Sequence, residues 1–534
     1  MRFELPSTRS SVKVALEIAY ILVISVVLVL LCVRRSHQHD LWPDEVLSLT
    51  IFRAGSWQHM MHGWFGGVDG GGIAYYLFGR PWMLLFGFTP LSMRLFSTAA
   101  VILSIVLLWI AVRRFYSTLS IIISITVVYL SSVTILWQNI NGRFYGLFLA
   151  AAAFNVWIFI RLTTAQQTSR RDYFLFAIAQ SLLIGSHVLG LIYSFAFIAG
   201  LFLFDIYHRH LRPRLYLCGV AGWSVLVLSL PAMMRTTSVA QKVFWTVKPR
   251  SRDLLLAVFA YSNVAKRFAS LLILCASITW LLHRFFWRRE PSHIDVCLDR
   301  EPLRFLIAIF WLAELIIFAK SQVGISIFAD RYLLPVALAT VLLLAELLEA
   351  SVSHLPVFLR GIASPVPTIL LATASFAIFA RHALVTDVYG PIYPRAGYTQ
   401  RIMATLPKDE VVVVTPPQIY ELLALEDPTH HYIFMNDRSF DLRPGTPVRD
   451  LAGFRLLDNW KAAGFYSNEI LSCSQALADY PRFTLVVADS QQDWLNDRIL
   501  QNVNLSKTKI ASVDDFITFT VWRIERVGHI PSCV

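Results

Sequence analysis

Long apolar runs constrain the fold of this chain more than any other feature. Runs of about 18 or more apolar residues recur through its first three quarters, which is typical of transmembrane helices. Hydrophobic residues make up 56% of the chain and charged residues only 15%, whereas soluble domains are about a quarter charged. The pattern predicts a polytopic α-helical membrane protein.

The first apolar run, residues 14–33, is too long for a signal-peptide core. It is followed by Arg34-Arg35-Ser36-His37 rather than by a small-residue cleavage site, so we expect it to remain as the first anchor. The net charge of +12 is not concentrated in a basic, low-complexity tail. We therefore expect no nucleic-acid partner, and we expect the cations between the runs to set topology and to contact membrane lipids.

The segment 73–88 decides the topology. It is aromatic, is interrupted by Arg80-Pro81 and is shorter than the roughly 20 residues that a span needs, so we expect a helix lying in the membrane interface. If this segment does not cross, the arginine clusters fall on one side at each return, as the positive-inside rule requires. The scheme then has about eleven spans, with a cytoplasmic N-terminus and an outside C-terminus. The later spans are expected at residues 92–112, 119–137, 144–162, 173–186, 188–207, 215–234, 268–286, 303–318, 332–348 and 366–383.

One outside loop, residues 235–267, carries many cations against this rule. They include Lys242, Lys248 and Arg250. Either the span count is wrong at this point, or the loop retains cations because it handles an anionic substrate at the membrane surface. Both interpretations remain open.

Two adjacent carboxylates, Asp44 and Glu45, follow Trp42-Pro43 where the chain leaves the first span. They could form a solvated acidic turn at a helix end. Alternatively, such a carboxylate can take a proton from an acceptor hydroxyl.

Further polar residues gather at the outward ends of the spans. A histidine at the short hairpin between residues 173 and 207 is expected below the outer surface, where it is either functional or held by a structural hydrogen bond. Arginines there could hold a phosphate or snorkel to the headgroups. The residues at these ends are Arg94, Arg143, Tyr145, His187, Arg331 and Tyr332.

The composition changes to that of a soluble domain near residue 384. Strands are expected at 411–415, 483–488 and 516–524, and helices at 419–425 and 494–501, which indicates a small α/β domain. We therefore divide the chain into a membrane domain, 1–384, with a first outside loop at 34–91, and a soluble α/β domain, 385–534. Cys473 and Cys533 could pair if that domain is extracytoplasmic.

In order and spacing, these motifs resemble the GT-C-fold glycosyltransferases, in the group that contains protein O-mannosyltransferases and lipid A aminoarabinose transferases. The resemblance covers about residues 40–348. The matching segments are Trp42 to Glu45, Tyr75 to Gly87, Arg94 to Ser97, Asn139 to Tyr145, Ser186 to Gly190 and Arg331 to Pro335.

The chain departs from the family pattern at three places. Gly70-Gly71-Gly72 stands where His-Pro-Pro or Pro-Pro is usual, Asn141 replaces an acidic residue, and Val188 replaces an aromatic one. These departures leave open which acceptor is used and whether a divalent metal takes part. The Trp-Trp-Asp motif of oligosaccharyltransferases is absent from the sequence, which argues against transfer of a preassembled oligosaccharide to asparagine.

The resemblance implies an enzyme of the bacterial plasma (inner) membrane, a hexosyl- or pentosyltransferase. It would move one sugar from a polyprenyl-phosphate carrier to a hydroxyl of a lipid, glycan or protein on the extracytoplasmic side. Asp44 would be the general base and Glu45 would orient it or the acceptor. The implied substrate-binding residues are Arg94, Arg143, Tyr145, His187, Lys242, Lys248, Arg250, Arg331 and Tyr332.

Two other functions remain to be weighed. A polytopic transporter could use the same intramembrane charges as a pathway, although we find no internal repeat in the sequence. A membrane-anchored assembly factor would leave Asp44, Arg143 and Arg331 unexplained.

Overall fold

The chain forms two compact units in the computed structural model, which describes residues 11–165, 167–240, 246–254, 300–353, 365–386, 395–415, 417–436, 448–466, 469–488, 499–514 and 518–528. The membrane unit comprises Met1–Val33, Arg94–Val227 and Thr246–Val388. The loop–sheet unit comprises Arg34–Met93, Leu228–Trp245 and Tyr389–Val534. The sequence had grouped residues 34–91 with the membrane helices, whereas here they share a unit with the C-terminal region.

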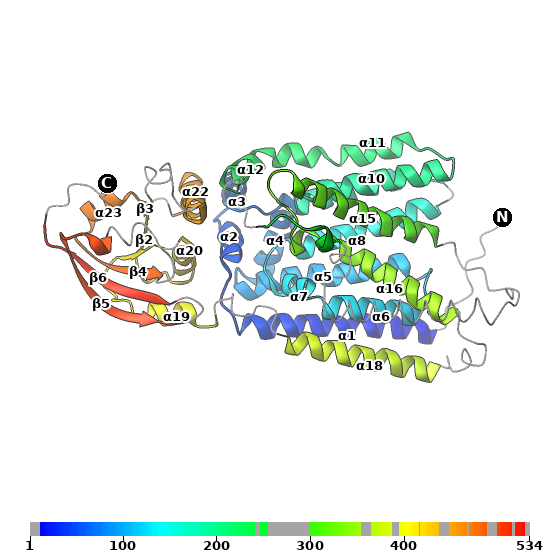
Figure 1. Ribbon diagram of the computed structural model, residues 1–534, viewed down its shortest axis with the longest axis horizontal. Coiled ribbons are helices and arrows are strands. Elements are labelled where there is room, and N and C mark those ends of the chain that lie inside the picture. Colours follow the sequence, from blue (N-terminus) through cyan, green and yellow to red (C-terminus); the bar gives the residue numbers. More distant parts are fainter. Residues whose placement is uncertain are drawn as a thin grey trace, which may run out of the picture. The chain divides into compact units, whose positions relative to one another are not determined.

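Long apolar helices build the membrane unit, and α8, α10 and α15 pack against one another (Figure 1). By length and composition, six described helical segments could cross a membrane, and a bent pair could add a seventh. The prediction of a multi-pass membrane protein is therefore confirmed. The expected span at 268–286 lies outside the described residues. The helices are α1 (Ser11–Ser36), α5 (Pro90–Val112), α6 (Thr118–Ser131), α7 (Val133–Ile140), α8 (Tyr145–Thr164), α9 (Arg170–Ser186), α10 (Gly190–Tyr207), α11 (Pro213–Ala221), α12 (Ser224–Ala240), α15 (Glu301–Gln322), α16 (Val336–Ser353) and α18 (Pro365–Val385).

The span expected at 119–137 is broken into α6 and α7, which meet at an angle of 70°. The break falls at Ser132, whose backbone is extended and whose Oγ accepts a hydrogen bond from the Ile135 N–H at 3.2 Å. Serine side chains compete with the helix backbone for its hydrogen bonds, so a serine pair is a common place for a sharp kink. Beyond the bend, α7 contacts α8.

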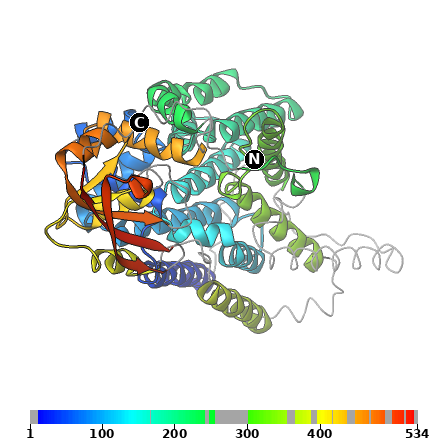
Figure 2. The same ribbon diagram turned by 60° about the vertical axis from the view of Figure 1, so that its left-hand side comes forward.

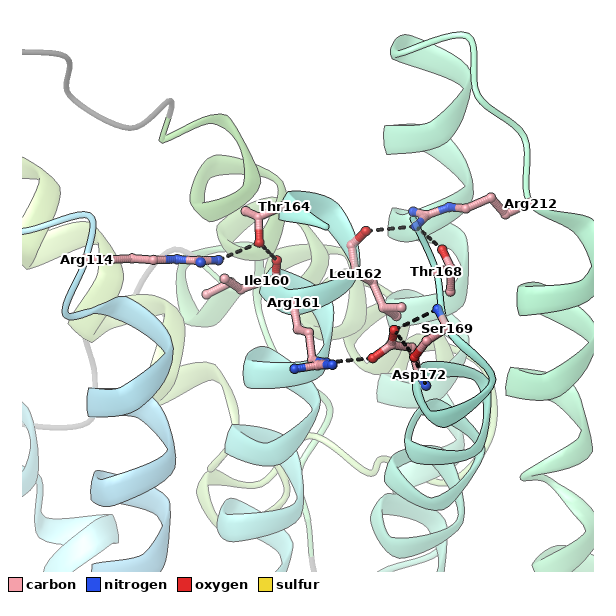
Figure 3. Close-up of polar contacts among 9 residues, drawn as sticks. All are labelled: Arg114, Ile160, Arg161, Leu162, Thr164, Thr168, Ser169, Asp172 and Arg212. Atoms are coloured by element: carbon pink, nitrogen blue, oxygen red, sulfur yellow. Dashed lines mark hydrogen bonds and ion pairs between the residues drawn. The ribbon is translucent and has the colours of Figure 1, made fainter. Parts of the chain in front are cut away.

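Near the C-terminal end of α8, arginines form hydrogen bonds and ion pairs with the neighbouring loops and helix ends (Figure 3). The Arg212 guanidinium donates to the Leu162 carbonyl at the end of α8 (2.8 Å). Arg161 forms an ion pair with Asp172 (2.6 Å), a carboxylate that also caps the first turn of α9. Cations near a helix C-terminus satisfy its free carbonyls and favour its dipole. These contacts explain part of the arginine pattern without a ligand.

The first loop folds into three short helices, α2 (Pro43–Phe52), α3 (Trp57–Phe65) and α4 (Ile73–Phe86). On α4, Tyr75 and Tyr76 are fully buried whereas Leu85 is 78% exposed. The Arg80 guanidinium of α4 donates to the Phe52 carbonyl at the end of α2 (2.9 Å). The helix α4 is not among the membrane-length segments of the described chain, and its position in the interface stays a prediction.

The C-terminal region forms a six-stranded sheet in the order β3-β2-β1-β4-β6-β5, with β5 and β6 in red in Figure 2. The first four strands in this order are parallel. β6 pairs antiparallel with β4, and β5 pairs antiparallel with β6 and forms the edge. Buried parallel strands are continuously apolar, as in the all-valine β1, whereas the outer strand β5 carries Lys507 and Lys509. The strands are β1 (Val412–Val414), β2 (Tyr432–Met435), β3 (Ile470–Leu471), β4 (Arg482–Ala488), β5 (Leu505–Val513) and β6 (Phe519–Arg526).

Helices join the parallel strands, namely α20 (Pro417–Glu426), α22 (Val448–Ala462) and α23 (Cys473–Asp479), and α19 (Tyr398–Met403) precedes β1. The predicted polytopic helical fold with a C-terminal α/β region is thus confirmed. Cys473 is buried and disulfide-bonded. Cys533 lies outside the described residues, so their pairing stays a prediction.

Direct hydrogen bonds hold the first loop to the sheet region within the loop–sheet unit. The Asp40 carboxylate accepts from the backbone N–H groups of Gly397 and Thr399, both at 3.1 Å. The Trp460 indole donates to the Val68 carbonyl (3.4 Å) from a fully buried position. The turn that carries Asp44 is therefore part of the same folded body as α20 and the sheet.

Candidate functional site

Two arginines, a histidine and four aromatic residues lie together in the membrane unit. We call them the aromatic–arginine cluster, and they come from the start of α8, from the α9–α10 turn and from the 3-10 helix η1 (Asp330–Tyr332). The His187 ring centroid lies 5.1–5.6 Å from four aromatic ring centroids. The cluster consists of Arg143, Phe144, Tyr145, Phe148, His187, Arg331 and Tyr332.

Both arginines of the cluster lie over aromatic rings. The Arg331 guanidinium is 5.8 Å from the Tyr145 ring centroid and 5.2 Å from that of Tyr332. The Arg143 guanidinium is 4.8 Å from the Phe144 centroid. Guanidinium groups are weakly hydrated and stack on aromatic faces, so this setting holds cations at low desolvation cost. Arg143 and Arg331 also interact electrostatically with His187.

The α9–α10 turn fixes the position of His187. Its Nδ1 accepts a hydrogen bond from the Leu189 N–H (3.0 Å), and its carbonyl accepts from the Gly190 N–H (2.8 Å). A Cβ on Gly190 would lie 2.0 Å from the Leu183 carbonyl oxygen, so only glycine allows the two helices this close. Because Nδ1 accepts, the neutral ring carries its proton on Nε2 and can donate it to a ligand.

Arg94 lies near the start of α5 and is 1% exposed. Its turn is tied to the α7–α8 junction, because Ser97 Oγ donates to the Arg143 carbonyl (2.8 Å) and Thr98 Oγ1 to the Asn139 carbonyl (2.7 Å). A Cβ on Gly146 would lie 2.5 Å from the Ser97 carbonyl oxygen, so α5 and α8 are in close contact here. Arg94 therefore belongs to the framework around Arg143.

The cations of the loop at residues 235–267 differ in position. Lys248 is exposed, and its Nζ donates to the Gln322 carbonyl (3.3 Å) in the segment that leads to η1. The Gln322 side chain in turn donates to the Pro249 carbonyl (2.8 Å). Arg250 is exposed as well, and its backbone N–H donates to Asp253. Lys242 lies outside the described residues.

Asp44 and Glu45 lie in the first turn of α2, in the loop–sheet unit. Pro43 begins the helix, where its locked φ suits the first position. Glu45 is fully buried, and its Oε2 accepts from the Trp42 N–H (2.9 Å), as the acidic residue of a capping box does. Asp44 is half-buried. The two carboxylates thus have different surroundings, and Glu45 helps to fix the turn that presents Asp44.

A third carboxylate, Asp69, lies beside the same face of α2. It is 2% exposed, and its Oδ2 accepts hydrogen bonds from Ser48 Oγ (2.9 Å) and from the Tyr76 hydroxyl. Ser48 is one helical turn beyond Asp44. Asp69 was not among the residues predicted from the sequence, although it stands directly before the Gly70-Gly71-Gly72 run.

Two more buried acids were missed. Glu421 of α20 is 2% exposed and interacts electrostatically with Asp44. Glu314, in the middle of α15, is 1% exposed and interacts with Tyr193, whose hydroxyl donates to the Tyr332 carbonyl (2.9 Å). A carboxylate inside an apolar span is itself a signal for function. Glu421 carries no comparable signal, because only packing places it against α2.

The described residues contain no group of three or more histidine, cysteine, aspartate or glutamate side chains that could hold a metal ion. The expectation that a divalent metal could take part is neither supported nor opposed by this finding.

No protein-family model and no curated protein matches the sequence of this chain. Solved structures with a similar fold include two of ArnT, a lipid A aminoarabinose transferase, from Cupriavidus metallidurans. One is bound to undecaprenyl phosphate (TM-score 0.58) and the other is in the apo state (TM-score 0.59). Each alignment covers 96% of this chain and 98% of that chain at 13% identity. The chain therefore has their GT-C fold, and the resemblance read from the sequence is confirmed at the level of the fold.

Proposed function

We propose that this protein is an integral-membrane glycosyltransferase that moves a single sugar from a polyprenyl-phosphate carrier to an acceptor hydroxyl on the extracytoplasmic side of the membrane. The observation that carries this proposal is the aromatic–arginine cluster, in which two guanidinium groups and an imidazole converge from three separate segments. Such a set suits a phosphate at a membrane surface, because arginine makes bidentate, charge-assisted hydrogen bonds to phosphate oxygens.

The cluster would act on the leaving group. As the bond between the anomeric carbon and the carrier oxygen breaks, its electron pair stays on the phosphate. Arg143 and Arg331 would stabilise the added negative charge, and the Nε2 proton of His187 would offer a further hydrogen bond. Because the arginines are already held by aromatic rings, little reorganisation is needed when the charge develops.

Asp44 is the proposed general base. The acceptor oxygen would attack the anomeric carbon while its proton passes to the Asp44 carboxylate. The cap formed by Pro43 and Glu45 holds the backbone of this turn in place. Glu45 is buried and already engaged in the cap, so its proposed role is to orient Asp44.

The comparisons support the donor class in this proposal. ArnT shares the fold over nearly the whole chain, and one of its structures is bound to undecaprenyl phosphate. A transporter is less well supported. That function would need the cluster to be part of a passage for the transported solute, and it gives no role to Asp44 in the first turn of α2.

Single-turnover transfer tests the proposal. Wild type or a variant is placed in membranes that contain native acceptor but lack the endogenous protein, and transfer of sugar from radiolabelled undecaprenyl-phosphate sugars to that acceptor is measured. We expect Asp44→Asn to bind the carrier normally but to lose about two orders of magnitude or more in transfer rate. Glu45→Gln is the matched control, because its amide oxygen can still accept the Trp42 N–H, and its loss should be smaller. Wild-type transfer by Asp44→Asn would refute the proposed base, and absence of transfer by the wild type from any such carrier would refute the proposed function.

A further inference from the structure

Glu421 is a buried carboxyl group in need of an explanation. It lies on α20, is 2% exposed, and its Oε1 has no hydrogen-bond partner among the residues that the structure describes. The hydroxyl of the neighbouring Tyr420 is likewise buried and without a partner in that part of the chain. Buried polar atoms are nearly always hydrogen-bonded in folded proteins, so an exception indicates a group retained for another purpose.

Its surroundings belong to the loop–sheet unit throughout. The helix α20 packs against α2, and the Arg53 guanidinium at the end of α2 donates to the Leu425 carbonyl of α20 (2.9 Å). Through this packing Glu421 comes within electrostatic range of Asp44. The C-terminal region thus contributes a second carboxyl group that interacts with the proposed base.

The topology of the sheet gives an independent reason to expect a ligand near the N-terminal end of α20, the helix that carries Glu421. The chain passes from β1 through α20 to β2 on one side, while β4 pairs with β1 on the other. In open parallel sheets, ligands bind at the carboxyl ends of the strands where the strand order reverses. Here that point is the end of β1, where Thr415 donates from its N–H to the Val486 carbonyl (3.2 Å) and α20 then begins.

Burial and the neighbouring Asp44 carboxylate raise the pKa of Glu421 well above its ordinary value. The group therefore keeps its proton, as a neutral carboxylic acid, to a higher pH than an exposed glutamate does. A neutral acid can donate one hydrogen bond and accept others. Those are the interactions that an acceptor hydroxyl needs.

We propose that Glu421 is a positioning residue for the acceptor, whose reacting hydroxyl or a neighbouring hydroxyl it holds by hydrogen bonds beside Asp44. This inference rests on the proposed glycosyl transfer. In that step the acceptor oxygen bonds to the anomeric carbon, the carrier phosphate leaves with its electron pair, and the hydroxyl proton moves to Asp44. Glu421 keeps its own proton and orients the nucleophile.

The test separates acceptor positioning from every other role of Glu421 by following two reactions of one donor. Full-length variants in membranes with native acceptor receive radiolabelled undecaprenyl-phosphate sugar, and label transferred to acceptor is counted apart from free sugar released by water. Glu421→Met keeps the length of the side chain but cannot hydrogen-bond strongly. It should lose about ten-fold in transfer, the effect of one hydrogen bond, while hydrolysis stays within about two-fold. Glu421→Gln retains a neutral donor and acceptor and should stay within about three-fold of wild type in both reactions.

Three results would overturn the inference. These are full transfer by Glu421→Met, an equal loss of transfer and hydrolysis in that variant, or a Gln variant as impaired in transfer as the Met variant. Glu421→Leu replaces Glu421→Met if the latter does not accumulate in membranes. Glu426→Met, at the part-exposed end of the same helix, is the control and should match wild type. Failure of the proposed function looks different, since the wild type would then transfer no sugar from any such carrier, whatever the residue at position 421. Failure of the proposed base would appear as normal transfer by Asp44→Asn.

Discussion

The guanidinium group of Arg331 lies over the ring of Tyr145, 5.8 Å from its centroid. The two residues come from η1 and from the start of α8, which are far apart in the sequence. His187, from a third segment, contacts the rings of both Tyr145 and Tyr332. An arginine that merely reached for lipid headgroups would not need this enclosure, so we expect Arg331 to bind the carrier phosphate.

Replacement of Arg331 should therefore weaken use of the donor. Charge-assisted contacts to a phosphate contribute about 1.5–3 kcal/mol each. Arg331→Ala should thus lower donor affinity or transfer rate by roughly ten- to a hundred-fold. Arg331→Lys should rescue only partly, because an ammonium cannot make the bidentate contact or stack on Tyr145. Titration of the purified protein with undecaprenyl phosphate measures the effect, and unchanged affinity and rate in Arg331→Ala would show that this arginine only anchors η1.

The α9–α10 turn should not tolerate a side chain at Gly190. A Cβ there would lie 2.0 Å from the Leu183 carbonyl oxygen, which the backbone cannot relieve without moving His187. We expect Gly190→Ala to lower the apparent melting temperature in detergent by several degrees, as overpacking of about 1–3 kcal/mol does, and to weaken carrier binding. Gly55→Ala is the matched control, because a Cβ at Gly55 would meet nothing within 4 Å. Equal melting temperatures for the two variants would contradict the close approach.

The cap at the start of α2 should matter more for geometry than for chemistry. Glu45→Ala removes the acceptor of the Trp42 N–H and should cost about 1 kcal/mol of stability. It should also slow transfer, because the turn that carries Asp44 is loosened. Glu45→Gln should retain most of both properties. Parallel measurement of melting temperature and transfer rate tests this, and an inactive but fully stable Glu45→Gln would indicate a direct chemical role for the carboxylate.

Stability should depend on pH through Glu421. Its pKa is raised in the folded state, mainly by burial and then by Asp44, so its stabilising contribution is complete below the unfolded value of about 4.5. That contribution is lost as the pH rises toward the folded pKa, by at most about 1.4 kcal/mol per pH unit. Glu421→Gln does not titrate, so its melting temperature should exceed that of wild type by a margin that grows with pH. A margin independent of pH would mean that Glu421 is ionised in the folded protein.

Chemical labelling can test on which side of the membrane each segment of the chain lies. Gln58 in the first loop and Thr508 on β5 are both exposed and belong to the loop–sheet unit. Single cysteines at either position, in a cysteine-free background, should react with an impermeant maleimide added to intact cells. A cysteine at the exposed Gln167, between α8 and α9, is expected on the opposite side and should react only after permeabilisation. Labelling of Gln167 in intact cells, or of only one of the other two, would overturn the eleven-span scheme.

Much of the architecture could be predicted from the sequence, because membrane helices satisfy their own backbone hydrogen bonds and need only sufficient apolar length. The same holds for local signals such as the proline and acidic turn at residues 43–45, and the apolar strands β1 and β4. These features depend on neighbours in the chain. Even here the kink at Ser132 was missed, since the Ser131-Ser132 pair does not reveal which of two backbone hydrogen-bonding patterns forms.

The tertiary structure alone decided which distant residues meet. Arg143, His187 and Arg331 were each visible as polar residues at the ends of spans, but their convergence depends on helix packing that no local pattern encodes. The grouping of the first loop with the C-terminal sheet arose in the same way, from contacts such as Asp40 with Thr399. Glu421 is the clearest case. On its own helix it is an ordinary glutamate, and only the packing of α20 on α2 removes it from water and brings it within electrostatic range of Asp44.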